Sequence, residues 1–193
     1  VTSEAPWEGR VYHACVSYDS RIWLLGGGGT SGGNDVWYSS DGESWTEATA
    51  AAPWAGRYKH SAVVHDGRMW VLGGRLGADY RRDVWYSENG TSWTQATSEA
   101  PWTPRQGQSS AVFDDKIWIF GGDYTSDVWC SEDGSSWTLV TPHADWAARV
   151  YHTSLVKDGK LWVIGRDVWS SPDGASWTET SPSVPWWSPR YGH

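Results

Sequence analysis

Short runs rich in apolar residues alternate with polar turn residues along the chain, and the clearest example lies between Trp54 and Trp102. Two turn signals, Asp66-Gly67 and Asn89-Gly90, each separate a pair of such runs. Both dipeptides tolerate a positive φ at the two central positions of a tight turn, so each pair predicts a β-hairpin. The stretch therefore predicts a four-stranded antiparallel meander with strands at Ser61–His65, Met69–Leu72, Asp83–Ser87 and Ser92–Ala96, and a longer connection over Gly73–Arg82.

The same meander recurs along the whole chain. Its opening signature W-x-x-R-x-x-H starts at Trp7, Trp54, Trp146 and Trp187, and a further copy at Trp102 has Gln108 in place of the histidine. The closing signature D-V-W-x-S-x-D/N-G-x-S-W-T starts at residues 35, 83, 127 and 167. One meander is too small to bury its own faces, so neighbouring copies must stack to form a core. The predicted repeats are 7–53, 54–101, 102–145 and 146–186, and residues 187–193 begin a fifth copy.

This pattern resembles the kelch repeat of β-propeller proteins. The resemblance rests on the arginine and histidine before the first strand, the Gly-Gly after the second strand, and the paired tryptophans of the third and fourth strands. The S-x-D-G-x-x-W turns also resemble a one-residue-shorter Asp-box of sialidase-type propellers. Both likenesses imply a fold and say little about activity. We therefore expect an all-β β-propeller chain with four kelch-like, four-stranded antiparallel blades, which form a single domain or part of one.

Composition supports this fold and excludes some functions. The chain has 18 tryptophans, which replace leucine and phenylalanine as the filler between blades. The closing tryptophans, which follow the Asx-Gly turns, are therefore predicted to pack between blades: Trp45, Trp93, Trp137 and Trp177. The net charge of −8 argues against a nucleic-acid partner. No apolar run has the length needed for membrane insertion.

Three further features concern location and assembly. Cys15 and Cys130 fall on different strands of non-adjacent repeats, so an internal disulfide is not expected and both are predicted to be small core residues. Asn89-Gly90-Thr91 is a glycosylation sequon, but it coincides with a predicted turn and proves nothing alone. The chain starts within a motif, which favours a processed, secreted protein or an excised piece. The duplicated ends favour association between copies (a homo-oligomer) or pairing with the remainder of a longer propeller.

The candidate functional face is the end of the blades that carries the W-x-x-R crossings and the loops between strands two and three. These loops differ between repeats while the framework repeats, and variable loops on a rigid scaffold commonly carry binding. The arginines there more often have a structural role, in which they tie adjacent blades together, than a role in ligand binding. The candidate ligand-binding residues are Trp7, Arg10, His13, Trp54, Arg57, His60, Arg75, Tyr80, Arg82, Trp102, Arg105, Trp146, Arg149 and His152.

Catalytic and metal-dependent functions find less support. A ring of arginines is similar to the carboxylate-binding arginines of sialidases, yet no dedicated Glu/Tyr nucleophile arrangement accompanies it. The histidines His13, His60, His152 and His193 could converge on a metal, but Gln108 breaks the set. The glycines from Gly27 to Gly32 have the spacing of the dinucleotide-binding motif G-x-G-x-x-G. No helix follows them, so they do not predict a dinucleotide site. We therefore predict no enzymatic activity, no catalytic residues, no metal and no cofactor.

Two classes of function remain. The first is a non-catalytic binding module, for which a glycan is one candidate, because exposed tryptophan faces stack on sugars. The second is a protein-interaction or assembly scaffold, because tryptophan, tyrosine and arginine are also the favoured anchors of protein interfaces. Solvent exposure of the opening tryptophans, or their burial between blades, separates the two.

Overall fold

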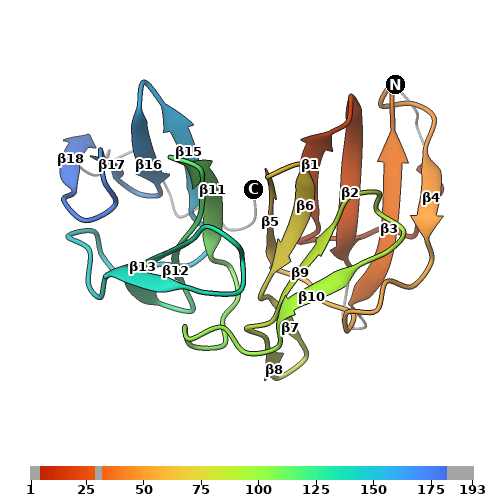
Figure 1. Ribbon diagram of the computed structural model, residues 1–193, viewed down its shortest axis with the longest axis horizontal. Helices are drawn as coiled ribbons and strands as arrows, with labels where there is room; N and C mark the ends of the chain where they lie inside the picture. The colour runs from red at the N-terminus through yellow and green to blue at the C-terminus, as the bar shows by residue number, and fades with distance from the viewer. Residues whose placement is uncertain (1–4, 29–31, 182–193) are drawn as a thin grey trace. The chain divides into compact units, whose positions relative to one another are not determined.

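A computed structural model describes residues 5–28 and 32–181 (Figure 1). Within these ranges the chain forms eighteen β-strands and no helix, and so no helix there could cross a membrane. Sixteen strands form four four-stranded antiparallel sheets, as predicted. The predicted start of a fifth copy, with Trp187, Arg190 and His193, lies outside the described residues and stays a prediction.

The chain divides into two compact units, Val1–Gln106 and Gly107–His193. In unit 1, blade 1 contains β1 (Ala14–Tyr18), β2 (Arg21–Gly27), β3 (Gly33–Ser39) and β4 (Thr46–Thr49). Blade 2 contains β5 (Ser61–His65), β6 (Arg68–Leu72), β9 (Val84–Ser87) and β10 (Thr94–Thr97). The connection predicted over Gly73–Arg82 folds into a small hairpin of its own, β7 (Arg75–Leu76) and β8 (Asp79–Tyr80).

Unit 2 repeats this plan without the extra hairpin. Blade 3 contains β11 (Ser109–Phe113), β12 (Lys116–Gly122), β13 (Thr125–Ser131) and β14 (Thr138–Thr141). Blade 4 contains β15 (Thr153–Lys157), β16 (Lys160–Ile164), β17 (Val168–Ser171) and β18 (Thr178–Ser181). Within each sheet the strands follow chain order, so each repeat forms one meander.

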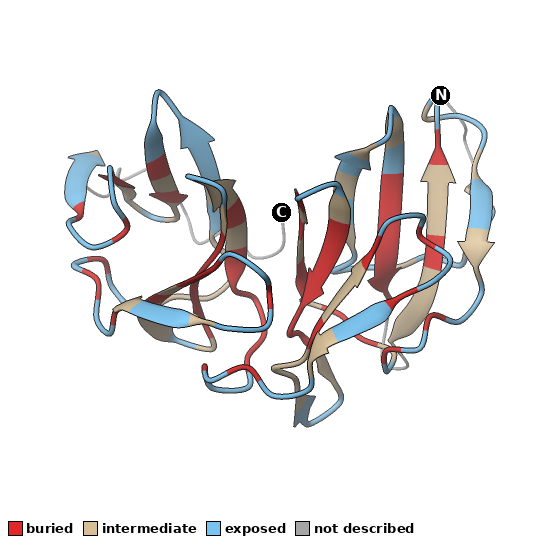
Figure 2. Cartoon of the chain, in the orientation of Figure 1, coloured by how far each residue is buried: buried red, intermediate tan, exposed pale blue. Residues whose placement is uncertain are grey.

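The core of each unit lies between its two blades. In unit 1, Trp23 and Leu25 of β2 face Met69 and Val71 of β6, and the opening Trp54 completes the cluster. Figure 2 shows buried residues along β2 and β6 and exposed residues on the outer strand β10. The second strand therefore presents Trp23 and Leu25 from one face in blade 1, and Met69 and Val71 from the alternate positions in blade 2, so apolar side chains on opposite faces of successive second strands meet between the blades.

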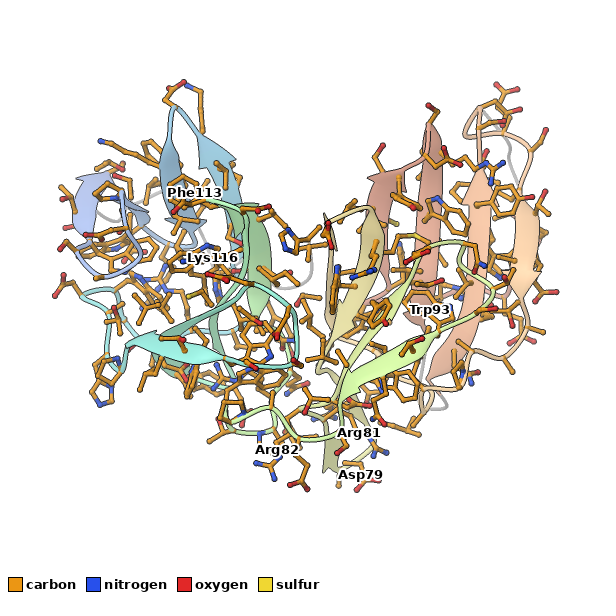
Figure 3. The ribbon with its side chains drawn as sticks, in the orientation of Figure 1. Asp79, Arg81, Arg82, Trp93, Phe113 and Lys116 are labelled. Carbon is orange, nitrogen blue, oxygen red and sulfur yellow. The ribbon has the colours of Figure 1, made fainter. Side chains whose placement is uncertain are left out.

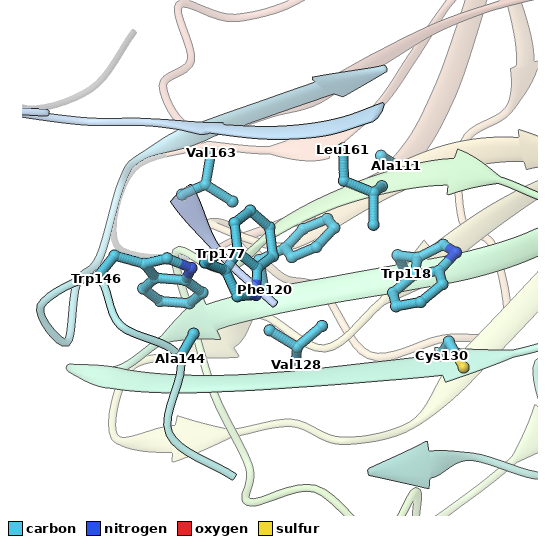
Figure 4. Close-up of a cluster of buried hydrophobic side chains, with 10 residues drawn as sticks. All are labelled: Ala111, Trp118, Phe120, Val128, Cys130, Ala144, Trp146, Leu161, Val163 and Trp177. Carbon is cyan, nitrogen blue, oxygen red and sulfur yellow. The ribbon is translucent and has the colours of Figure 1, made fainter. Parts of the chain in front are cut away.

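Unit 2 builds its core from the corresponding positions (Figure 4). Trp118 and Phe120 of β12 face Leu161 and Val163 of β16, and the opening Trp146 lies beside them. The Trp146 ring meets the ring of Trp177 edge-on, at 5.9 Å between centroids. This repetition shows how a chain with only two phenylalanines fills its interior with indole rings.

The closing tryptophans divide into two groups. Trp93 and Trp177 are buried between the blades of their units, as predicted. Trp45 and Trp137 are only half-buried. The difference follows from position, because Trp45 and Trp137 belong to the first blade of each unit and no earlier blade of that unit covers them.

The two predicted turn types have different outcomes. Asp66-Gly67 forms a tight turn with φ of 48° and 63°, as predicted. The prediction of a second tight hairpin at Asn89-Gly90 was wrong, because only Gly90 has a positive φ and β10 begins four residues beyond it, at Thr94. The Ser87 Oγ accepts a hydrogen bond from the Gly90 N–H at 2.8 Å, so side chains close a wider loop here.

The two cysteines also differ. Cys130 is buried in the core of unit 2, as predicted, whereas Cys15 on β1 is exposed, so the prediction that it lies in the core was wrong. Side chains alternate between the two faces of a strand, and Cys15 lies on the face of β1 opposite to Val16, which packs on the core. Both are free thiols.

Candidate functional site

Three opening arginines, Arg10, Arg57 and Arg149, each pair with the aspartate that starts the D-V-W motif of the same repeat. Arg57 donates to both carboxylate oxygens of Asp83, at 2.7 and 2.8 Å. Arg10 and Asp35 pair in the same way, at 2.8 and 2.7 Å. Arg149 and Asp167 form the corresponding ion pair in unit 2, at 2.8 Å. The two ends of the repeat, 26 residues apart for Arg57, are thus joined by a two-pronged ion pair.

The ion pair lowers the pKa of the aspartate. Burial alone would raise the pKa of Asp83, but the hydrogen bonds and charge of Arg57 outweigh burial and lower it. The indole N–H of Trp85 also donates to Asp83, at 2.8 Å. The carboxylate therefore stays charged and holds both the arginine and the indole of the third strand.

The backbone of the same arginine binds the preceding blade. The Arg57 N–H donates to the Gly33 carbonyl of blade 1, and the Arg57 carbonyl accepts from the Gly27 N–H, both at 3.0 Å. Arg149 makes the equivalent bonds to Thr125 and Gly122 within unit 2. Each such arginine therefore joins two blades, with its backbone on one and its side chain on the other.

The histidine of the opening signature packs against the second glycine of the Gly-Gly pair, which explains why a glycine is needed there. His60 packs on the backbone of Gly74, where a Cβ would lie 2.7 Å from the His60 Cβ. In the third repeat Gln108 takes the same place against Gly122. Burial and then the charge of Arg57 lower the pKa of His60 to about 3, and the nearby Leu25 carbonyl offsets only part of this. The histidine is a neutral packing residue at ordinary pH.

These observations place the predicted site residues in distinct groups. The residues with buried side chains are Trp54, Arg57, His60, Trp102, Arg105 and Trp146. Those half-buried in the same framework are Trp7, Arg10, Arg149 and His152. His13 is exposed, although it packs on Gly27 as His60 packs on Gly74. The predicted residues that are half-buried and lie outside the ion-pair framework are Arg75, Tyr80 and Arg82.

One group of side chains at the crossing and loop end of unit 1 lies outside the ion-pair framework, and we call it the tyrosine–cation row: Tyr12, Lys59, Tyr58, Arg75 and Tyr80. Tyr12 is exposed, Lys59, Arg75 and Tyr80 are half-buried, and Tyr58 is buried. The Lys59 Nζ lies 4.6 Å from the Tyr12 ring centroid and 5.8 Å from that of Tyr58. The Arg75 guanidinium lies 5.4 Å from the Tyr58 ring and 5.5 Å from the Tyr80 ring. At these distances each cation is attracted to the ring faces beside it, so the row is a continuous cation–π arrangement.

The backbone fixes the row in place. Tyr58 and Arg75 exchange two backbone hydrogen bonds at 3.0 Å, and the Lys59 N–H donates to the Tyr12 carbonyl at 3.0 Å. Tyr12 and Lys59 both have a φ near 57°, the left-handed region, which directs them away from the strands that follow. The row therefore spans from the crossing of blade 1 to the hairpin of blade 2.

Arg75 is the distinctive residue of the row. Its Nε donates to the Tyr58 hydroxyl at 3.1 Å and its Nη1 donates to the Tyr80 hydroxyl at 3.2 Å. The bond to Tyr58, then that to Tyr80, raises the pKa of Arg75. No carboxylate of residues 5–28 or 32–181 pairs with it, unlike Arg81 and Arg82, which pair with Asp79 and Glu99. Figure 3 labels Asp79, Arg81 and Arg82 at this hairpin.

Unit 2 differs at the same positions. Gly107 and Tyr151 take the place of Tyr12 and Lys59, and the connection after β12 is a two-residue turn, Asp123-Tyr124. Tyr124 is 72% exposed. Across the part of the chain that the structure describes, no three His, Cys, Asp or Glu side chains gather in a way that could hold a metal. His193 of the considered histidine set lies outside that part.

Sequence reasoning missed Tyr12, Tyr58 and Lys59, as well as the aspartates of the ion pairs. The three row residues occupy the variable positions between arginine and histidine in the opening signature. Their signal is a concentration of tyrosine and lysine at those positions in the first two repeats, R-V-Y-H and R-Y-K-H. The signal for the aspartates is their strict presence ahead of V-W in all four repeats.

Comparison with known families agrees with the repeat geometry. The sequence profile of the KLHDC2/KLHL20/DRC7 Kelch-repeats domain matches residues 1–166. The chain belongs to the kelch-repeat family. Its four sheets are kelch-type β-propeller blades, as the resemblance implied. No curated protein matches the sequence. Kelch-repeat domains are generally non-catalytic binding scaffolds that engage other proteins.

Proposed function

We propose that this kelch-repeat chain is a non-catalytic scaffold that binds a protein partner at the crossing and loop end of unit 1. The observation that carries the proposal is the tyrosine–cation row. It offers two accessible tyrosines, Tyr12 and Tyr80, and two cations, while the buried Tyr58 supports both cations from below the surface. Tyrosine and arginine are favoured anchors of protein interfaces. The framework arginines Arg10 and Arg57 are held by their own aspartates, whereas no carboxylate of the described residues pairs with Arg75, so Arg75 is the charge that a partner can use.

The charge of the row favours a partner segment that carries carboxylates. The Arg75 guanidinium keeps donors beyond its two tyrosine bonds, and its planar fork matches a carboxylate. Two tyrosines hold the guanidinium in one orientation, which reduces the side-chain entropy lost on binding. An acidic segment would also contact Tyr80, the half-buried tyrosine beside Arg75.

A glycan ligand has less support. The glycan hypothesis rested on exposed tryptophan faces, and the opening tryptophans Trp54, Trp102 and Trp146 are at most 1% exposed. In the row, cations already lie over the rings of Tyr12, Tyr58 and Tyr80. One flat face of each of these rings is therefore occupied by a cation and is not open to a sugar.

Selection of peptides from a random-sequence phage library on the immobilised chain tests the proposal. Selected peptides should be acidic, and their affinity should fall at least tenfold in Arg75→Ala and in Tyr80→Ala, because anchor residues typically contribute 2 kcal/mol or more, by order of magnitude. The matched control is Arg68→Ala. Arg68 also lies over a tyrosine, 4.9 Å from the Tyr86 ring, but at the other end of β6.

Two outcomes would overturn the proposal. Peptides that bind both row variants as tightly as the unmodified chain would move the binding surface elsewhere. A glycan array provides the second outcome, because glycan binding that is lost in the same row variants would replace the protein partner with a sugar.

A further inference from the structure

The turn between the third and fourth strands is built in the same way in all four blades. A serine Oγ accepts the N–H of the turn glycine, at 2.8 Å in blades 1, 2 and 3 and 2.7 Å in blade 4. An Asx Oδ1 two residues after the serine accepts two further backbone N–H groups, as at Asp133, at 2.8 and 2.7 Å. Blade 2 alone combines an asparagine, Asn89, with a threonine two residues on, Thr91.

The hydrogen bonds of this turn fix how the Asn89 amide points. Its Oδ1 accepts the N–H of Thr91, the hydroxyl of Thr91 and the N–H of Ser92, each at 2.9 Å. All these partners are donors, so the oxygen faces the turn and the Nδ2 faces away from it. No described residue hydrogen-bonds to that Nδ2, and Asn89 and Thr91 are exposed.

Gly90 is the residue of this turn that faces the protein interior. A Cβ on Gly90 would lie 2.0 Å from the Trp23 ring of blade 1, so Gly90 packs against the core. The Tyr18 hydroxyl lies 2.7 Å from the Gly67 carbonyl and 3.0 Å from the Glu88 carbonyl, and this end of the blades is opposite to the tyrosine–cation row. A large group on the Asn89 Nδ2 would therefore extend into solvent without breaking a bond or covering the row.

We propose that Asn89 is an N-glycosylation site that accepts an oligosaccharide from a lipid-linked diphosphate donor. The Nδ2 attacks C1 of the first sugar and forms the N–C bond, while the bond from C1 to the diphosphate oxygen breaks. The lipid diphosphate leaves with the electron pair, and the amide loses one proton. The Asn-x-Thr sequon supplies the acceptor, and the exposed turn supplies access. This inference is independent of the proposed binding function.

Translation of the full chain, preceded by a cleavable signal sequence, in the presence of microsomal membranes tests the site. The expected product carries one glycan, which peptide N-glycosidase removes. Asn89→Asp should carry none and should keep the turn, because the other three blades have aspartate there. Thr91→Ala should also carry none. Asp133→Asn creates Asn-Gly-Ser at the equivalent turn of blade 3 and should carry two glycans.

A translocated chain without a glycan at Asn89 would overturn the proposal. If Asp133→Asn then carried a single glycan at its new site, the Asn89 turn itself would be the inaccessible element. If neither site were modified, this turn geometry as a class would not serve as an acceptor. A glycan at Asn89 that persists in Thr91→Ala would overturn the role given to the sequon.

Discussion

The buried histidine of the second repeat should make the stability of the chain depend on pH between 7 and 5. Burial, reinforced by the charge of Arg57, lowers the pKa of His60 in the folded chain to about 3. The unfolded chain binds the same proton with a pKa of about 6.5. Protonation therefore favours unfolding, so the stability contributed by His60 is fully present above pH 6.5 and is lost as the pH falls towards 3.

The size of the effect follows from that difference. Each pH unit below 6.5 costs about 1.4 kcal/mol while only the unfolded chain is protonated, so His60 should cost about 2 kcal/mol at pH 5. The folded pKa values of Asp35 and Asp83 are lowered from 3.8, so their contributions are lost only at more acidic pH. Between pH 7 and pH 5, a change in stability therefore reports the protonation of histidine and not of these aspartates.

The third repeat provides the comparison variant. Gln108 takes the histidine position there and is buried, so His60→Gln should fit the same space without a titrating ring. Urea unfolding followed by tryptophan fluorescence would give the free energy of unfolding at pH 7 and pH 5 for both chains. The unmodified chain should lose about 2 kcal/mol more than the variant over this window. Equal losses in both chains would show that the ring takes up a proton in the folded state, and the reasoning from burial would fail.

Three further substitutions test the packing and the ion pairs by the same unfolding measurement. Trp93→Ala should cost roughly 3–5 kcal/mol, and a loss below about 1 kcal/mol would contradict burial between blades. Gly90→Ala should cost more than Gly67→Ala, because both have a positive φ but only Gly90 faces an indole ring; equal losses would leave strain alone as the cause. Arg57→Ala should cost roughly 3–5 kcal/mol by stranding a partly buried aspartate, while Arg82→Ala, whose ion pair is exposed, should cost less than about 1 kcal/mol. A similar loss in both arginine variants would mean that burial does not strengthen the framework pair.

The strands were predictable because the turn residues and apolar runs that determine them lie next to one another in the sequence. Asp66-Gly67 determines its hairpin through backbone preference alone, and the apolar run from Met69 to Leu72 can pack only as a strand between two turns. The Asn89-Gly90 turn was mispredicted for a related reason. There the side chains of Ser87 and Asn89 supply the hydrogen bonds, and this overrides the preference of the dipeptide for a two-residue turn.

The candidate site was harder to predict because its parts are distant in sequence. The opening arginine could be recognised as a repeated residue, but whether it binds a ligand or an aspartate depends on a pairing 26 residues away. The row depends on blade stacking, which brings Tyr12 beside Lys59 of the next repeat. Periodicity within one repeat carries no information about which neighbouring side chains stacking will bring together.

The ion pair beneath the loops of the first, second and fourth repeats has a consequence for how such proteins can diversify. Between the second strand and the aspartate, the second repeat carries the ten residues Gly73–Arg82, whereas the fourth carries only Gly165 and Arg166. Both keep the arginine–aspartate pair, at 2.7 and 2.8 Å. The pair closes the blade regardless of what the chain does above it. Insertions at this point therefore change the surface without changing the scaffold, and the connection in the fourth repeat is a natural place to graft a new binding loop.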